Sequence, residues 1–368
     1  MEVQETALHK LASSEAAEKT ELFKCTATAH PNIALVKYWG RRDSMLNLPS
    51  TGSISVTLNH LITTTTVVFN PQLEHDVLLL NGTRASAPQE DRVSKFIDIF
   101  RREAGLASFA QVVSENNFPM EIGLASSAAA FAALTLATAG ALQRQYSIPR
   151  LSELARRGSS SAARSIFGGF VEMKPGQNPE GSDAVAVPLY ARDYWPLEIL
   201  IFITTETKKN VASSEGMIRS ALTSPYYQSW LDTNPNDLEL IRGALERKDF
   251  QLLGEITELN CLKMHGLIMT ANPGIIYWNH VTVSLIHEVQ RLRKEGIPAY
   301  FTIDAGPQVK VFCPKSFTPK IKKELSHIPG IKQILTCGIG PGATVVVPHT
   351  KKPFWKKVSK IQKIFSKK

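Results

Sequence analysis

Residues 116–131 read NNFPMEIGLASSAAAF, and this stretch gives the clearest indication of how the chain folds and what it binds. Pro119 and Gly123 predict a turn, and the alanine-rich run 128–142 that follows has high helix propensity. The stretch therefore predicts a loop that leads into a helix N-terminus. The first four amide groups of a helix have no partner within it, and the helix dipole places partial positive charge there. A phosphate is a natural ligand for such a terminus.

Small residues fill positions 123–130, so a polyphosphate could approach the backbone closely. Ser126 and Ser127 could bind phosphate or present a hydroxyl group to a metal ion. The string GLASSAAA supports equally well a serine N-cap on a tightly packed helix. It is neither a Walker A loop nor a GxGxxG dinucleotide turn, so a different phosphate loop is needed.

The composition is that of a soluble globular protein with one large or two medium domains. Of the 368 residues, 43% are hydrophobic and 20% are charged. No apolar run approaches the roughly 18–20 residues that span a bilayer. Residues 1–21 lack the apolar core of a secretion signal, so we expect a flexible N-terminal extension and a cytoplasmic protein.

Most of the positive charge lies at the C-terminus. Residues 349–368 contain eight lysines and no acid, so they account for eight of the nine formal net charges. The nearly neutral remainder argues against a nucleic-acid-binding surface. The four cysteines, at 25, 261, 313 and 337, form no CxxC pair, and we expect buried, reduced thiols instead of disulfides or a zinc site.

The first half of the chain is rich in predicted strands. Residues 23–39 are β-rich, residues 54–69 predict one long strand or two paired strands, and residues 77–80 and 109–114 predict further strands. Helix is expected over 91–103. Strands that precede most of the helices favour an α+β arrangement over a Rossmann-type alternation.

A second serine-rich segment, LSELARRGSSSAARSIFGGF, covers residues 151–170 and predicts a short helix, a break and a second helix start. Ser159, Ser160 and Ser161 precede Arg164 by no more than five residues, so hydroxyl groups and a guanidinium could converge on one anion. The alternative is an N-capped helix that carries a surface arginine.

The second half is expected to begin with a strand over 197–204 and a helix start near Ser213 and Ser214. An amphipathic helix is predicted over 276–294. Strands over 299–303 and 309–313 flank DAGP, which places Asp304 at a strand end, facing a cleft or serving only in a turn. A last pair of strands, 331–337 and 343–347, is expected around GIGPG.

Five blocks, taken in order, resemble the diphosphomevalonate decarboxylases of the galactokinase, homoserine kinase, mevalonate kinase and phosphomevalonate kinase superfamily. The blocks are PNIALVKYWGRRD (31–43) with LNLPSTGSISVTL (46–58), NNFPMEIGLASSAAAFAAL (116–134), GSSSAARSIFGGFVEM (158–173), SSEGM (213–217) and TIDAGP (302–307).

The resemblance implies a two-lobed, small-molecule-kinase-like α+β fold. Its N-terminal lobe would be like domain 2 of ribosomal protein S5, its C-terminal lobe would be ferredoxin-like, and the active site would lie in the cleft between them. We expect a flexible extension over 1–21, an ATP-binding lobe over 22–190, a second lobe over 191–350 and a basic tail over 351–368. The implied reaction is ATP-dependent decarboxylation of mevalonate 5-diphosphate to isopentenyl diphosphate, with Mg²⁺.

The resemblance also implies roles for individual residues. Asp304 would be the base or orienting carboxylate, and Arg164 would hold the carboxylate that leaves as carbon dioxide. Substrate would contact Lys37, Tyr38, Arg41, Ser159, Ser161 and Ser213. ATP would contact Gly123, Leu124, Ala125, Ser126, Ser127 and Ala128, and Ser127 is also a candidate metal ligand.

The chain departs from the family pattern at four places. Arg41 replaces a lysine, and Gln308 replaces the asparagine of DAGPN. Gly52 replaces a residue that carries a side chain in the usual TNSS segment, and Glu121 adds an acidic residue to the phosphate loop. A monophosphate decarboxylase or a mevalonate 3-kinase is therefore an alternative. A catalytically silent binding protein of the same fold is an alternative from another class.

The resemblance suggests a homodimer that binds no nucleic acid. In residues 353–368, PFWKKVSKIQKIFSKK, apolar residues recur at three- and four-residue spacing and lysines fill the other face. Such a basic amphipathic helix could dock on the protein or contact an anionic membrane.

Overall fold

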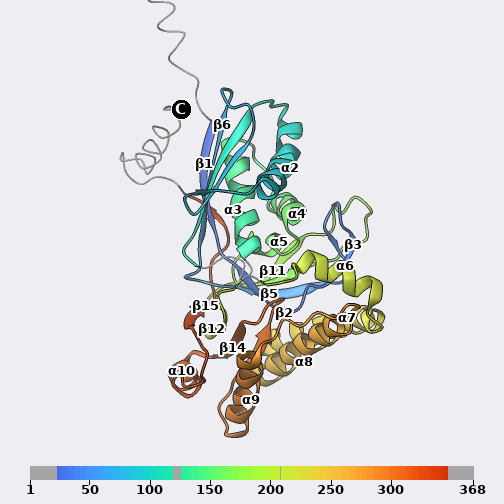
Figure 1. The fold of residues 1–368 in the computed structure, drawn as a ribbon, viewed down its shortest axis with the longest axis vertical. Helices are drawn as coiled ribbons and strands as arrows, with labels where there is room; N and C mark the ends of the chain where they lie inside the picture. The colour runs from blue at the N-terminus through green and yellow to red at the C-terminus, as the bar shows by residue number, and fades with distance from the viewer. Residues whose placement is uncertain (1–22, 119–125, 208, 347–368) are drawn as a thin grey trace, which may run out of the picture.

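Three sheets of four or six strands organise the part of the chain that the computed structural model describes, residues 23–118, 126–207 and 209–346 (Figure 1). The largest has six strands in the order β16-β1-β6-β9-β7-β8. Its members are β1 (Phe23–Ala29), β6 (Thr63–Asn70), β7 (Val77–Leu80), β8 (Thr83–Arg84), β9 (Phe109–Asn116) and β16 (Thr344–Val345). Strand β6 alternates buried and half-buried residues, as expected for a strand with one face on a core.

Helices cover one face of this sheet in the upper part of Figure 1. They are α2 (Ala87–Ala104) and α3 (Ser126–Ala141), while α4 (Ile148–Gly158) and the short α5 (Ala162–Ser165) pack against α3. The alanine-rich α3 packs directly on β1 and β6, and its small side chains allow a close approach. A Cβ atom at Gly140 would lie 2.4 Å from Cys25 Sγ, so this position has room only for glycine unless the cysteine moves. The close packing fixes where the N-terminus of α3 points.

The second sheet lies in the middle of the molecule, with strand order β11-β10-β5-β2. Its strands are β2 (Asn32–Val36), β5 (Ser53–Thr57), β10 (Phe170–Met173) and β11 (Ala186–Tyr190), and a small hairpin, β3 (Arg41–Asp43) and β4 (Leu48–Pro49), follows β2. Every residue of β2 and β5 is buried. A strand buried on both faces needs a cover on each side, and α5 and the helix pair α7 and α8 contact this sheet.

The third sheet, in the order β13-β14-β12-β15, lies in the lower part of Figure 1. Its strands are β12 (Leu197–Ile203), β13 (Tyr300–Ile303), β14 (Val309–Pro314) and β15 (Gln333–Gly338). The helices here are α6 (Ser213–Thr223), α7 (Tyr227–Arg247), α8 (Phe250–Met269), α9 (His280–Lys294) and α10 (Thr318–Leu325), with a 3-10 turn η1 (Lys315–Phe317). One apolar core combines residues of β2, β5, β12, α7 and α8, so it joins the second sheet to the third.

The expectation of one long strand or a strand pair over 54–69 is wrong. Strands β5 and β6 belong to different sheets, and the chain turns between them at His60, whose φ is 60°. Likewise, the β-rich run 23–39 divides into β1 and β2, which also lie in different sheets. Alternation of residue types predicts strands but does not show which sheet each strand joins.

The last predicted strand pair is also wrong, because β15 pairs with β12 whereas β16 pairs with β1. The connection GIGPG therefore runs from the third sheet to the first. A Cβ atom at Gly340 would lie 2.0 Å from the Leu58 carbonyl oxygen, and one at Gly342 would lie 2.6 Å from that of Ile166. The glycines are required because this crossing passes directly against backbone.

Two helices have different starts from those predicted, and in both cases a capping box sets the start. Helix α2 begins at Ala87, before the expected residue 91, because Ser86 and Gln89 form a capping box. Helix α9 begins at His280 and not at 276, because Asn279 and Thr282 form another.

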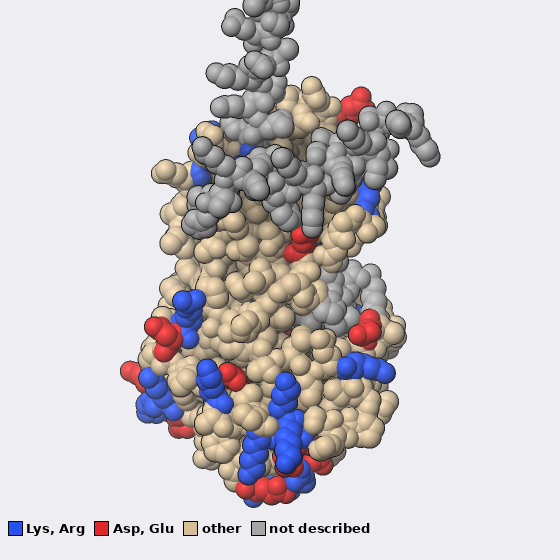
Figure 2. Space-filling view, turned by 90° about the vertical axis from the view of Figure 1, so that its left-hand side faces the viewer, with Lys and Arg blue, Asp and Glu red and all other residues tan. Residues whose placement is uncertain are grey.

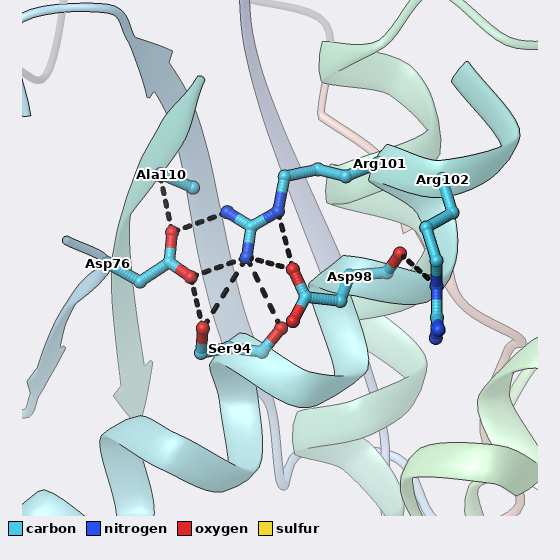
Figure 3. A network of polar contacts seen from close by, with 6 residues as sticks. All are labelled: Asp76, Ser94, Asp98, Arg101, Arg102 and Ala110. Atoms are coloured by element: carbon cyan, nitrogen blue, oxygen red, sulfur yellow. Dashed lines mark hydrogen bonds and ion pairs between the residues drawn. The ribbon is translucent and has the colours of Figure 1, made fainter. Parts of the chain in front are cut away.

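A buried ion pair fastens α2 to the first sheet (Figure 3). Arg101 donates from Nη1 and Nη2 to the two carboxylate oxygens of Asp76, each at 2.7 Å. Asp76 also accepts from Ser94 Oγ and from the Ala110 amide. Burial alone would raise the pKa of Asp76, but these hydrogen bonds outweigh it and lower the pKa. The pair lies in the N-terminal lobe, and neither residue lines the cavity described below.

Charges of both signs are mixed on the face shown in Figure 2, where Lys and Arg lie beside Asp and Glu at the end of the molecule that carries α9 and α10. Arg291, for example, pairs with Glu288, Glu295 and Glu324. All four cysteines are free thiols; three are buried and Cys25 is half-buried. None of the described helices is long and apolar enough to cross a membrane.

Candidate active site

A cavity of about 510 Å³ brings together predicted residues from all five sequence blocks. Of the predicted residues that the structure describes, all except Ala128 line this cavity. They are Lys37, Tyr38, Arg41, Ser126, Ser127, Ser159, Ser161, Arg164, Ser213 and Asp304. Segments that are more than 250 residues apart in sequence, such as those of Lys37 and Asp304, therefore share one wall.

The start of α3 forms one end of the cavity. Ser126 and Ser127 are its first two residues and line the cavity, whereas Ala128 is fully buried. The predicted residues Gly123, Leu124 and Ala125, and also Glu121, lie outside the described residues. An exposed serine hydroxyl at a helix N-terminus suits a nucleotide phosphate, or a magnesium ion carried by one.

Asp304 lies at the end of β13 with a lysine at each carboxylate oxygen. Lys37 Nζ lies 2.7 Å from Oδ1, and Lys310 Nζ lies 3.2 Å from Oδ2. Both lysines are buried, whereas about a quarter of the Asp304 side chain (23%) is exposed. Burial alone would raise the pKa of Asp304, but the charges of Lys310 and Lys37 outweigh it and hold the pKa well below its usual range. Asp304 is therefore a carboxylate at neutral pH.

Arg164 is held from behind by polar side chains of β2 and β5. Its Nε donates to Ser55 Oγ at 2.8 Å, its Nη1 donates to Ser53 Oγ at 2.5 Å, and its Nη2 donates to Asn32 Oδ1 at 3.0 Å. The expectation of a surface arginine, which was the alternative for this segment, is wrong because Arg164 is only 2% exposed. Burial lowers the pKa of Arg164 to about 10, so it stays charged at neutral pH. A charged, immobilised guanidinium can bind a carboxylate through two hydrogen bonds.

A chain of hydroxyl groups connects the first block to the serine-rich segment. Tyr38 Oη donates to Ser160 Oγ at 2.7 Å and accepts from Arg41 Nε at 3.2 Å. Ser159 Oγ and Ser161 Oγ lie 3.2 Å apart. Arg41 thus uses the Nε edge of its planar guanidinium group to orient Tyr38. A lysine ammonium group at this position would contact Tyr38 with a different geometry.

The backbone beside Lys37 is also fixed from the second half of the chain. The Lys37 amide donates to Asn260 Oδ1 at 2.7 Å, and Asn260 Nδ2 donates to Asp237 Oδ2 at 2.6 Å. Both Asn260 and Asp237 are buried. This chain of hydrogen bonds ties the end of β2 to α7 and α8.

Cations outnumber acids on the cavity wall. The described lining residues include Lys37, Arg41, Arg92, Arg164 and Lys209, against Asp304 and Glu215. Glu215 is paired with Arg219. A narrow space with this charge excess attracts polyanions such as nucleotides and diphosphates.

Four polar residues of the site were missed from sequence: Asn32, Arg92 and Lys209, which line the cavity, and Lys310, which contacts Asp304 from behind it. Lys209 Nζ donates to Ser213 Oγ at 2.7 Å, and Arg92 reaches the cavity from α2. Only Lys310 carried a usable signal, since a lysine inside the apolar strand VKVFC needs a buried acidic partner. The others depend on tertiary contacts.

Two departures from the family pattern have structural explanations. A Cβ atom at Gly52 would lie 2.8 Å from Leu238 Cδ1, so glycine allows α7 to approach β5. Gln308 is fully buried, accepts from the Thr204 amide at 2.6 Å and donates to the Thr205 carbonyl at 2.7 Å. Gln308 therefore closes the ends of β12 and β14 and does not line the cavity.

Two family models match the chain almost end to end. Residues 29–186 match the diphosphomevalonate decarboxylase-like N-terminal domain, and residues 199–359 match the mevalonate 5-diphosphate decarboxylase C-terminal domain. The diphosphomevalonate decarboxylase of Candida albicans is 33% identical over 352 residues, covering 87% of this chain and 97% of that protein.

Solved structures agree with these matches. The mevalonate diphosphate decarboxylase of Staphylococcus aureus has a TM-score of 0.84 and 39% identity, covering 89% of this chain and 98% of its own. A structure of MDDEF in complex with MVAPP, AMPPCP and magnesium has a TM-score of 0.84 and 40% identity, covering 89% of this chain and 100% of its own. The resemblance seen in the five sequence blocks is thereby confirmed, and the chain belongs to the diphosphomevalonate decarboxylase family.

Proposed function

We propose that this protein catalyses the ATP-dependent decarboxylation of mevalonate 5-diphosphate to isopentenyl diphosphate, with release of ADP, phosphate and carbon dioxide. The observation that carries the proposal is that Asp304 and Arg164 line one cation-rich cavity with the serine-led start of α3. The relatives named above have the same activity in their names, and MDDEF was solved with MVAPP, an ATP analogue and magnesium.

In the first step, Asp304 orients the tertiary 3-hydroxyl and accepts its proton as the oxygen attacks the γ-phosphoryl group of ATP. Lys37, at 2.7 Å from Asp304 Oδ1, holds the carboxylate in place and adds positive charge beside the transferred group. The start of α3, with Ser126 and Ser127, binds the nucleotide phosphates. Magnesium carried by ATP would neutralise phosphate charge, with the Ser127 hydroxyl as a candidate ligand.

In the second step, the C3–O bond breaks and phosphate leaves with the bonding electrons. The C1–C2 bond then breaks, its electrons form the C2–C3 double bond, and C1 departs as carbon dioxide. Arg164 holds the C1 carboxylate in the orientation that this fragmentation requires. Tyr38, Arg41, Ser159, Ser161 and Ser213 supply the remaining substrate contacts.

The decisive experiment measures ADP and carbon dioxide together for mevalonate, its 5-phosphate and its 5-diphosphate. We expect equimolar ADP and carbon dioxide, with the highest kcat/KM for the diphosphate. ADP without carbon dioxide would identify a kinase, and a preference for the 5-phosphate would identify a monophosphate decarboxylase.

The organisation of the chain is part of the proposal. We infer an N-terminal extension over 1–21, an ATP-binding lobe over 22–190, a second lobe over 191–350 and a tail over 351–368, in a cytoplasmic homodimer. Strand β16 belongs to the segment 191–350, yet it pairs with β1 of the segment 22–190 and extends the sheet of that lobe. The extension and the tail lie outside the described residues, and the lysine-rich sequence of the tail suits contact with an anionic membrane.

A further inference from the structure

Lys310 is the second residue of β14, an otherwise apolar strand, and is fully buried. Its neighbours Val309 and Val311 pack into the core that α9 covers, so Lys310 points to the opposite face of the sheet, as Phe312 does. Lysine is almost never fully buried without a partner, because removing its charge from water is costly. The ion pair with Asp304 offsets part of this cost.

The two lysines reach Asp304 from different sides. Lys37 lines the cavity and contacts Oδ1 at 2.7 Å, whereas Lys310 does not line the cavity and approaches Oδ2 at 3.2 Å from within the protein. A carboxylate with a cation at each oxygen has one preferred rotation about its Cβ–Cγ bond. Ligands that enter the cavity meet Lys37 and the partly exposed carboxylate, but not Lys310.

Stability alone does not explain Lys310. A buried ion pair is often no more stabilising than apolar side chains of similar volume, because desolvation offsets the attraction. When a polyanionic ligand binds beside Asp304 and displaces water, both effects favour protonation of the carboxylate. A cation such as Lys310 opposes that protonation, whereas an apolar residue at the same position would not.

We propose that Lys310 is a positioning residue for the decarboxylation: it keeps Asp304 ionised and fixes the rotation of its carboxylate relative to Lys37. The role of Lys310 in the reaction rests on the proposed function, but the charge coupling between Lys310 and Asp304 can be measured without turnover. Other titratable or charged groups also act on Asp304 and Lys310 and are unchanged in the test. They are Lys37, Arg164, Cys261 and His265.

The test compares the wild-type chain with Lys310→Met, which keeps length and removes charge, and with Lys310→Arg, which keeps charge. The control is Lys315→Met, which removes an exposed lysine just after the same strand. The Asp304 carboxyl carbon is followed by ¹³C NMR over pH in each protein and is assigned by its absence in Asp304→Asn.

We expect the Asp304 titration to lie below the usual aspartate range in the wild type, Lys315→Met and Lys310→Arg. In Lys310→Met it should move up by at least about one pH unit, because one neighbouring cation is lost. The acid limb of kcat/KM should move with it, while kcat falls at least about tenfold and KM for ATP stays within about twofold.

An Asp304 titration in the ordinary aspartate range in the wild type would overturn the inference without any variant. So would an unchanged titration in Lys310→Met, or an equal shift in Lys310→Arg, which would point to packing and not charge. A wild-type protein that releases no carbon dioxide from mevalonate 5-diphosphate would overturn the proposed function, and the NMR result would still decide the charge coupling.

Discussion

Lys37 Nζ and Asp304 Oδ1 lie 2.7 Å apart although 267 residues separate them in sequence. Lys37 follows β2 of the middle sheet and Asp304 follows β13 of the lower one, so the ion pair spans the two parts of the molecule that enclose the cavity. Any relative shift of these parts changes the charge next to the carboxylate. The geometry of the site and the packing of the two sheets are therefore coupled.

Replacement of Asp304 by asparagine should lower turnover by at least ~10²-fold, because the amide keeps the shape but cannot accept the proton. Carbon dioxide release from mevalonate 5-diphosphate at saturating ATP measures this. Turnover close to that of the wild type would mean that Asp304 serves only in the DAGP turn and takes no part in the reaction.

Replacement of Arg164 by lysine should reduce kcat by at least about tenfold. An ammonium group cannot make two parallel hydrogen bonds to the leaving carboxylate and also keep the contacts with Asn32 and Ser53. Arg156→Lys is the matched control, since Arg156 is fully buried but lies outside the cavity. It should lower the Tm and leave the kcat of the folded enzyme unchanged. Equal kcat values for Arg164→Lys and the wild type would make this guanidinium structural.

Ser127→Ala should raise KM for ATP about fivefold, the effect of losing one hydrogen bond of about 1 kcal/mol. KM for mevalonate 5-diphosphate should stay within about twofold, which separates the two ligands. Ser147→Ala, at the start of α4, serves as a control because its hydroxyl caps a helix away from the cavity. A larger change in KM for the mevalonate substrate than for ATP would contradict the assignment of α3 to the nucleotide.

Asp76→Asn should lower the free energy of unfolding by about 2–3 kcal/mol at pH 7, because it removes charge-assisted hydrogen bonds from the buried Arg101 and leaves Asp98 as its remaining carboxylate partner. The folded pKa of Asp76 is lowered, so its contribution is complete above the unfolded pKa and is lost as the pH falls through the folded pKa. The difference between variant and wild type should therefore shrink below about pH 4. Urea titrations at several pH values measure it, and a difference that does not change with pH would refute the ionic role.

The full chain should sediment with anionic vesicles and not with neutral ones, because each lysine near an anionic surface contributes about 1 kcal/mol. A chain that ends at Thr350 should sediment with neither. Negligible binding by both chains would favour a tail helix that docks on the protein.

The sequence predicted most elements and many of the residues that line the cavity, and it failed on pairing. The β-branched residues between 63 and 70 indicated β6, and the alanines after Ser127 indicated α3, because both signals are local. Sheet membership depends on contacts between distant segments, so β5 and β6 were wrongly treated as one strand or one pair. Arg92 and Lys209 were missed for the same reason, since nothing in their neighbourhoods shows that they face a cavity.

Burial was the other property that local sequence did not show. Arg164 looked like a possible surface residue, yet its polar neighbours Asn32, Ser53 and Ser55 lie on β2 and β5, more than 100 positions earlier. Serines in the apolar strand SISVT would have been the only local indication that a buried polar group lies opposite.

The pairing of β16 with β1 also sets the order in which the protein can be completed during synthesis. Thr344 pairs with Thr28, so β1 remains an open sheet edge until almost the whole chain has left the ribosome. The first lobe can collapse early around α3 and β6, but its sheet closes last. A nascent chain that stops before residue 344 leaves Ala27 and Thr28 without these partners, so residues 344 and 345 protect that part of the edge from pairing with other strands.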